Sequence, residues 1–312
     1  MNGSQAAWLP DGRRLHLNHG PIDLIIEAFG RAEEVQRAYA QAVKRFETVL
    51  NELVEELAEL RRPAATRPRS FAGPIAGRME RAVCRHFPAF ITPMAAVAGS
   101  VADEIMTALL SGRTLDKAYV NNGGDSALYL ADGHSLTAAI AGTGQGFADR
   151  IAIFAEDPVR GIATSGWRGR SHSLGIADAV TVLAGTAAEA DAAATLIANA
   201  VDLPGHPGVV RVAACTIDPD SDLGARMVTR HVGALSSRDV AAALDRGLAV
   251  AEAMRSDRTI VAAALFLAGE VRLCGDLMHR TRVGYGASSD RNPLPVGFSL
   301  LGAKTAASAE LL

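Results

Sequence analysis

The stretch that decides the fold is AYVNNGGDSALYLADGHSLTAAIA, residues 118–141. Within it, short runs of β-forming residues alternate with Gly, Asp and Asn turns, which is typical of consecutive antiparallel strands. Similar runs follow downstream, so we expect strands at Ala118–Asn121, Ala127–Ala131, Leu136–Ala141, Arg150–Ala155 and Ala179–Leu183. The sequence therefore predicts an α+β fold in which helices pack on a mostly antiparallel sheet.

Upstream of this stretch the hydrophobic pattern has two different periods. Arg14–Ala28 alternates around a Gly-Pro turn and predicts a β-hairpin at an edge of the sheet. Apolar side chains then recur at helical spacing over 31–60, which predicts one long amphipathic helix. Prolines break the pattern in 61–77, where we expect a hinge loop. A further helix should run from Thr92-Pro93 to Gly112, because proline suits a first helical turn and glycine a helix end.

The segments after residue 187 complete the layers of the predicted fold. We expect helices at Ala188–Val201, near Leu223–Val232 and at Arg238–Met254, and strands at Val209–Ala214 and Ile260–Leu267. Residues 276–312 are rich in Gly, Ser and Ala without a clear period, and we expect a peripheral tail there. Residues 1–275 should therefore form a single domain.

Composition excludes several classes of protein. Hydrophobic residues make up 49% of the 312 residues and charged residues 21%, which is ordinary for a folded domain. The net charge is −3 and the basic residues are scattered, so we expect no nucleic-acid partner. We find no signal peptide and no apolar run of about 18 residues, which predicts a cytoplasmic protein without a membrane partner. Cys84, Cys215 and Cys274 lack the spacing of a zinc site and fit a reducing compartment.

A turn rich in small residues is the first candidate for a binding site. Asn121-Asn122-Gly123-Gly124 joins two predicted strands, and its glycines would let the main chain approach a cofactor. Asp125 follows directly and places a carboxylate at the rim, where it would orient a substrate or assist a proton transfer. The alternative is a tight hairpin turn without a functional role.

Hydroxyl and arginine side chains follow the next apolar strand. Thr164-Ser165-Gly166 ends that strand, and Arg168 and Arg170 lie just beyond it. Small polar residues beside guanidinium groups can hold the phosphate oxygens of a cofactor. His172 lies nearby along the chain and could act as an acid or base. The alternative is a hairpin whose arginines and histidine are solvated.

An acidic and a hydroxyl residue share one face of a predicted helix. Asp191 and Thr195 are four residues apart, so their oxygens point to the same side, where Mg²⁺ could use them. Asp191 could equally be an acid in the first helical turn that favours the helix dipole, with Thr195 merely packed. The spacing alone leaves both interpretations open.

Taken together and in this order, the segments resemble the ApbE family of flavin transferases (FAD:protein FMN transferases). They resemble more closely an uncharacterised cytoplasmic family of that superfamily, and the likeness covers roughly residues 93–202. Besides the three segments, it includes the helix Gly99–Leu110 with Asp103 and the strand residues 180–182. The order of these blocks along the chain makes the resemblance specific.

The resemblance implies a layered ApbE-like fold and a Mg²⁺ site. The ion would be held by Asp191, Thr195 and the main-chain carbonyl of Ala163, and it would meet the phosphates of FAD. The implied activity passes the FMN half of FAD to a Thr or Ser of an acceptor protein. Two departures concern activity: Ala98 stands where the family has a lysine, and the short segment Trp167–Asp178 replaces a longer one that carries a histidine.

Three functions follow from these patterns. The first is a Mg²⁺-dependent transferase-like enzyme that acts on FAD, FMN or a related phosphorylated nucleotide. The second is a non-catalytic protein that binds flavin or another cofactor. The third is a small-molecule hydrolase that uses Ser165, His172 and Asp125 in a remodelled pocket. The wide apolar stripe of the helix over 31–60 further suggests a homodimer.

Overall fold

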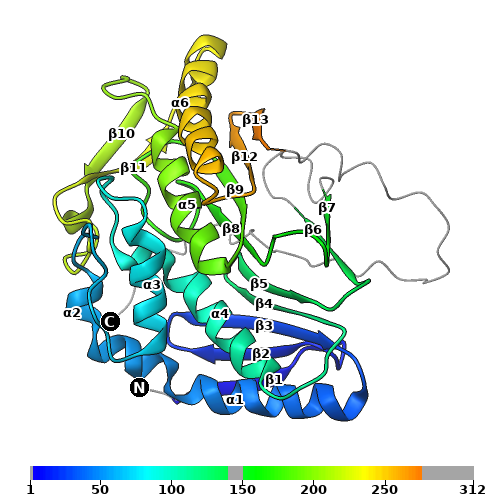
Figure 1. Ribbon diagram of the computed structural model, residues 1–312. Coiled ribbons are helices and arrows are strands. Elements are labelled where there is room, and N and C mark those ends of the chain that lie inside the picture. The colour runs from blue at the N-terminus through cyan, green and yellow to red at the C-terminus, as the bar shows by residue number, and fades with distance from the viewer. Residues whose placement is uncertain (1–2, 140–149, 276–312) are drawn as a thin grey trace, which may run out of the picture.

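The computed structural model describes residues 3–139 and 150–275, and its centre is one antiparallel sheet of nine strands. The strand order is β1-β2-β3-β4-β5-β8-β9-β12-β13 (Figure 1). The bounds are β1 Gln5–Trp8, β2 Leu15–His19, β3 Ile22–Phe29, β4 Lys117–Asn122, β5 Asp125–Leu130, β8 Gly161–Ser165, β9 Ala179–Ala184, β12 Ala262–Leu267 and β13 Glu270–Cys274. Strands from both ends of the described chain therefore lie in one continuous sheet.

Helices cover one face of this sheet, and a small hairpin covers part of the other (Figure 1). The helices are α1 Ala32–Glu55, α2 Leu57–Leu60, α3 Pro74–Cys84, α4 Val97–Leu110, α5 Ala187–Ala200 and α6 Ser237–Ser256, with single 3-10 turns at Pro93–Ala96 (η1) and Ala214–Thr216 (η2). The hairpin is β6 Ser135–Ala139 with β7 Arg150–Phe154. A second two-stranded sheet pairs β10 Val209–Ala213 with β11 Met227–Val232.

The two faces of the sheet belong to different hydrophobic clusters because successive side chains of a strand point to opposite sides. On the helical face, Val120 and Val182 belong to clusters shared with α4 and α5. On the other face, Leu128 and Phe266 belong to a cluster shared with Ile151 of β7. The central strands therefore carry apolar side chains on both faces, and a polar residue in one of them needs a specific explanation.

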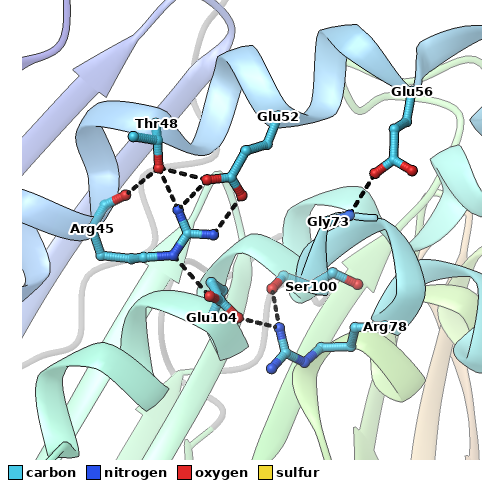
Figure 2. Close-up of polar contacts among 8 residues, drawn as sticks. All are labelled: Arg45, Thr48, Glu52, Glu56, Gly73, Arg78, Ser100 and Glu104. Atoms are coloured by element: carbon cyan, nitrogen blue, oxygen red, sulfur yellow. Dashed lines mark hydrogen bonds and ion pairs between the residues drawn. The ribbon is translucent and has the colours of Figure 1, made fainter. Parts of the chain in front are cut away.

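A network of arginine and glutamate side chains joins three of the helices (Figure 2). Arg45 of α1 donates from Nε to Glu104 of α4 over 2.8 Å, and Arg78 of α3 donates to the other oxygen of Glu104 over 2.9 Å. Arg45 also forms a bidentate pair with Glu52, about two turns further along α1. We call Arg45, Glu52, Arg78 and Glu104 the arginine–glutamate network, and it fixes α4 against α1 and α3.

The predicted fold class is confirmed, and most predicted strands lie within about two residues of those observed. The hairpin β2–β3 is present, but it is not the edge because β1 pairs outside β2. The helix predicted near Leu223–Val232 is wrong: this segment contains β11, which pairs with β10 and in which Val228 and Thr229 are buried. Branched side chains such as these fit a strand better than a helix.

Helix boundaries differ from the expectation around the predicted hinge. The long helix ends at Glu55, and a short helix, α2, follows it. The expected loop 61–77 is shorter than predicted because α3 begins at Pro74, where the missing amide hydrogen is no loss in the first helical turn. Positions 140–141 of one predicted strand, and the predicted tail 276–312, lie outside the described residues.

The segment Pro93–Leu110, η1 with α4, is apolar enough to pass a length-and-composition test for a membrane span, with a mean hydropathy of 1.3 over 18 residues. The expectation that no segment approaches this length was therefore too strong. Over half of the segment, 56%, is buried inside the protein, where α4 packs against α1, α3, α5, β4 and β5. This burial makes α4 a core helix of the domain.

Candidate functional site

The candidate residues gather at one end of the sheet, because neighbouring antiparallel strands alternate in direction. β4 and β8 end there, and β5 and β9 begin there. Gly123 and Gly124 connect β4 to β5 with positive φ angles of 65° and 128°, which glycine adopts without strain. The predicted tight turn is thus present, and it places Asn122 directly opposite Asp125.

Asp125 begins β5 with a buried carboxyl group. Its Oδ1 accepts a hydrogen bond from the main-chain N–H of Thr164 over 3.1 Å, which ties the start of β5 to the end of β8. Its Oδ2 accepts no hydrogen bond from any residue that the structure describes. Burial raises the pKa of Asp125 well above the usual range, and the Thr164 N–H and the charge of Arg170 only partly oppose this.

Asp191 lies in the second turn of α5 and faces the N-terminus of α4. Its Oδ2 accepts a hydrogen bond from the main-chain N–H of Gly99 over 3.0 Å, and the N–H of Ala98 also stabilises the carboxylate. Burial raises the pKa of Asp191, and the negative charge of Asp125 raises it further. Because α5 begins at Ala187, the interpretation of Asp191 as a first-turn acid of its own helix is wrong.

The N-termini of α4 and α5 meet beside these carboxyl groups. Asp103 of α4 accepts hydrogen bonds from the main-chain N–H groups of Ala187 and Ala188 over 3.1 and 3.0 Å, so it caps α5 from another helix. Gly99 has no room for a side chain, since a Cβ there would lie 2.2 Å from the carbonyl oxygen of Ala187. Burial raises the pKa of Asp103 to about 6, although the two N–H donors lower it.

The two asparagines of the first segment lie on opposite faces of the sheet. Asn122 donates to the carbonyl oxygen of Ala98, on the helical face that carries Asp125. Asn121 instead donates to the hydroxyl group of Ser126, its partner across β4 and β5. Alternation along a strand requires this division. A ligand that contacts both asparagines must therefore reach around the end of the sheet.

The segment 163–166 is divided in the same way. Ala163 is fully buried opposite Val182 and belongs to the cluster on the helical face. Thr164 shares a hydrogen bond of 2.9 Å with the hydroxyl group of Thr181, on the other face. Gly166 packs so closely on the next strand that a Cβ would lie 2.5 Å from the carbonyl oxygen of Asp178.

Three predicted site residues have side chains without hydrogen bonds to other residues in the described part of the chain. They are Ser165, His172 and Thr195. Thr195 follows Asp191 by one helical turn on α5, as the spacing predicted. No hydrogen bond links Ser165, His172 and Asp125 to one another, so the hydrolase interpretation stays a prediction.

The two predicted phosphate-binding arginines have different surroundings. Arg168 donates to Asp178 over 2.6 Å, and its guanidinium lies 4.7 Å above the ring of Trp167. Arg170 instead lies against Gly123, and its charge lowers the pKa of Asp125. The structure thus brings Arg170, and not Arg168, close to the carboxyl group of Asp125.

We call Asp125 and Asp191 the carboxylate pair. The raised pKa values of both groups show that burial and mutual repulsion disfavour the doubly ionised pair. Carboxylate oxygens are the ligands that Mg²⁺ prefers, so the residues present fit a hard cation. Within residues 3–139 and 150–275, no three His, Cys, Asp or Glu side chains form a metal cluster. A cation here would therefore also need hydroxyl or main-chain oxygens, as predicted for Thr195 and Ala163.

Sequence reasoning missed the contribution of the main chain at the start of α4. Ala98 and Gly99 bind Asp191, and Ala98 also accepts the hydrogen bond from Asn122. The available signal was Gly99 itself, because glycine inside a helix is unfavourable unless something packs closely against it. Ser126 and Thr181 are polar residues in otherwise apolar strands. They indicated the hydrogen bonds to Asn121 and Thr164 on the other face of the sheet.

A comparison with protein families decides the relationship: the model described as AbpE bacteria matches residues 6–273. The chain belongs to this family. The match spans nearly all of the described residues, so the resemblance predicted from the order of the sequence blocks is confirmed at the level of the family.

Several curated proteins resemble part of this AbpE-family chain. A UPF0280 protein from Methanopyrus kandleri is 39% identical over 123 residues, which are 36% of this chain and 44% of that protein. A UPF0280 protein from Methanothermobacter thermautotrophicus is 34% identical over 134 residues, 42% and 50% of the two chains. The matched stretch thus spans about half the length of these relatives.

Solved structures of two flavin transferases also superpose on the chain. A mutant of the flavin transferase ApbE from Vibrio cholerae gives a TM-score of 0.46 at 13% identity, covering 86% of this chain and 99% of that one. The apo flavinyl transferase ApbE from Pseudomonas stutzeri gives 0.41 at 12% identity, covering 90% and 97%. These values are too low to support an argument about activity.

Proposed function

We propose that this AbpE-family chain binds a flavin nucleotide together with Mg²⁺ and transfers its FMN half to a hydroxyl group of an acceptor protein. The observation that carries the proposal is the carboxylate pair: the buried Asp125 and the half-buried Asp191 lie close enough to repel each other, and no basic side chain of the described residues hydrogen-bonds to either. Ionised groups in such a position need a cation. The family resemblance suggests FAD as the accompanying ligand.

The chain offers oxygen ligands of three kinds for the cation. Asp191 would supply a carboxylate oxygen, Thr195 its hydroxyl group and Ala163 its main-chain carbonyl. Bound Mg²⁺ would stabilise the negative charge that develops as a pyrophosphate bond is cleaved. The hydrogen bond from Gly99 already fixes the side chain of Asp191 before a ligand binds, so binding does not have to restrict its motion further.

Asp125 is the best candidate for moving a proton. Burial raises its pKa toward the range in which a carboxylate accepts protons effectively near neutral pH. Thr164 fixes one of its oxygens and leaves the other free of hydrogen bonds from the described residues. The free oxygen would accept the proton of an acceptor hydroxyl group, while Arg170 provides positive charge beside the phosphates.

A second candidate function is flavin binding without transfer. It is favoured by His172, which forms no hydrogen bond with a described residue although the family resemblance implies a catalytic histidine in this region. The short segment between Trp167 and Asp178 gives the same indication from the sequence. A cytoplasmic location and a homodimer stay predictions under both functions.

The test combines binding and product analysis. Purified protein is mixed with FAD and either MgCl₂ or a chelator, and bound flavin is measured by fluorescence while FMN and AMP are separated by chromatography. We expect FAD to bind only with Mg²⁺. Without an acceptor, water should take the place of the acceptor hydroxyl group and hydrolyse the pyrophosphate slowly to FMN and AMP. Asp191→Asn should lose binding, whereas Asp245→Asn, which changes an exposed aspartate of α6 paired with Arg272, should keep it.

Each outcome favours one function. Binding with product formation supports the transferase, and the modified residue of an acceptor can then be located by mass spectrometry. Binding without product under all conditions supports the non-catalytic function. If the wild-type chain binds neither Mg²⁺ nor FAD, both functions are wrong.

A further inference from the structure

The loop after β8 carries two arginines, two residues apart, whose surroundings differ. Arg168 is engaged by Asp178 and by the ring of Trp167. Arg170 is exposed and donates no hydrogen bond to a residue within the described ranges. The two residues share a loop and a charge, so they form a natural pair for comparison.

Arg170 occupies a space that exists only because residue 123 is glycine. A Cβ at Gly123 would lie 2.2 Å from Nη2 of Arg170 and 3.4 Å from its Cζ. Any side chain at this position would displace the guanidinium group. The same position lies two residues before Asp125, and the charge of Arg170 acts on that carboxyl group.

We propose that Arg170 is the built-in counter-charge of the carboxylate pair and changes partner when a ligand binds. Without a divalent cation, its guanidinium group stays over Gly123 and offsets the charge of Asp125. With the pair neutralised by a cation, its unused N–H donors bind a nucleotide phosphate. The proposal rests on the proposed function, because it assigns a second state to a residue of the same site.

The number and geometry of the N–H hydrogen-bond donors of arginine suit both states. A guanidinium group has five N–H donors in a fixed fork that matches phosphate geometry, and it stays charged at every physiological pH. Arg170 uses none of these donors on the described residues. Its place over a glycine turn, without a strong partner, lets the side chain move without breaking an ion pair.

This arrangement predicts effects of opposite sign on two ligands. A positive charge near the carboxylate pair repels a divalent cation, so removal of Arg170 should strengthen cation binding. The same removal takes away a phosphate partner, so nucleotide binding should weaken. A purely structural role for Arg170 would weaken both.

The experiment compares Arg170→Gln with Arg168→Gln by titration calorimetry. MgCl₂ is titrated first into protein without nucleotide, and FAD is then titrated at saturating Mg²⁺. We expect Arg170→Gln to bind Mg²⁺ about three- to tenfold more tightly and FAD about tenfold more weakly. Arg168→Gln should change each affinity by less than about twofold.

A conservative variant separates charge from geometry. Arg170→Lys keeps the charge, so its Mg²⁺ affinity should stay near the wild-type value, while its FAD affinity should fall because lysine lacks the planar fork. Thermal melting of each variant shows that the fold is retained. Both changes are on an exposed side chain, which makes loss of the fold a poor explanation for any effect.

The results separate the two proposals. Unchanged or weakened Mg²⁺ binding in Arg170→Gln would overturn the counter-charge role, and unchanged FAD binding would overturn the change of partner. Either result leaves the proposed function intact as long as the wild-type chain binds both ligands. Failure of the wild-type chain to bind Mg²⁺ would instead end the proposed function and this inference with it.

Discussion

Two groups of acidic side chains lie beside α4, and within the described residues only one of them is hydrogen-bonded to arginine side chains. In the arginine–glutamate network, Glu104 accepts hydrogen bonds from Arg45 and Arg78, one on each oxygen (Figure 2). In the carboxylate pair, the charge of Asp125 acts on Asp191, and both carboxyl groups are held by main-chain N–H groups. Charged side chains therefore hydrogen-bond to the first group, whereas main-chain N–H groups hydrogen-bond to the second.

This difference separates a structural from a functional role for buried charge. A protein that needed the carboxylate pair only for folding could have replaced it with apolar residues at a gain in stability. Instead, the chain aligns the N–H groups of Thr164 and Gly99 with two groups whose ionised forms burial disfavours. Perturbed carboxyl groups of this kind are typical of functional sites.

The largest effect is expected from removing one member of the carboxylate pair. Asp191→Ala should reduce Mg²⁺ affinity below detection, by at least about a thousandfold, because it removes the charged ligand and leaves Asp125 alone. In the presence of a chelator the same variant should melt at a higher temperature than the wild type, since the repulsion is gone. Calorimetry and thermal melting measure the two effects. Unchanged Mg²⁺ affinity would contradict the assignment.

The matching change in the arginine–glutamate network should lower stability and leave the Mg²⁺ affinity almost unchanged. Glu104→Ala leaves Arg45 and Arg78 without their shared partner, so we expect the free energy of unfolding to fall by roughly 2 to 4 kcal/mol. The affinity for Mg²⁺ should stay within about threefold of the wild-type value, because the network does not contact the pair. Chemical denaturation and calorimetry test this together. Glu59→Ala, which removes an exposed partner of Arg62, is the control and should cost less than about 1 kcal/mol.

Much of the fold and part of this site could be predicted from the sequence. Strand and turn patterns gave the antiparallel sheet, and the spacing of Asp191 and Thr195 gave their common helix face. The helix predicted near 223–232 failed because its apolar residues fit more than one period, and pairing with β10 decided the outcome. Local pattern alone carries no information about which partner strand is available.

The rest of the site depends on contacts between distant segments. Arg168 and Arg170 look equivalent in the sequence, and they are distinguished by contacts that the fold creates, with Asp178 for Arg168 and with Gly123 for Arg170. Asn121 and Asn122 were both expected to bind the cofactor, although the exact end of β4 sends them to opposite faces. Such distinctions need strand register, which a single sequence does not specify.

The comparison also predicts how stability depends on pH. Burial raises the pKa of Asp103 to about 6 and raises that of both members of the carboxylate pair, so the folded protein binds more protons than the unfolded chain between pH 4 and these values. Stability without a cation should therefore fall as pH rises through this window, with Asp103 alone contributing on the order of 3 kcal/mol.

The corresponding measurement is a series of melting curves from pH 4 to pH 8 with either a chelator or MgCl₂. We expect the decline with rising pH to be steeper with the chelator, because Mg²⁺ stabilises the ionised pair. Asp125→Asn should make the chelator curve flatter. Identical curves with and without Mg²⁺ would show that the pair holds no cation.

The smallest expected effect concerns Thr195, whose hydroxyl group has no hydrogen bond to a described residue and lies one turn beyond Asp191. Thr195→Val keeps the shape of the side chain and removes one neutral oxygen ligand, so Mg²⁺ affinity should fall by about three- to tenfold while thermal stability hardly changes. Thr107→Val, which alters an exposed hydroxyl group on α4 bonded to the carbonyl oxygen of Asp103, should leave the affinity unchanged. If both variants bind Mg²⁺ like the wild type, Thr195 is only packed, and the cation must take its remaining oxygens from the main chain and from the ligand.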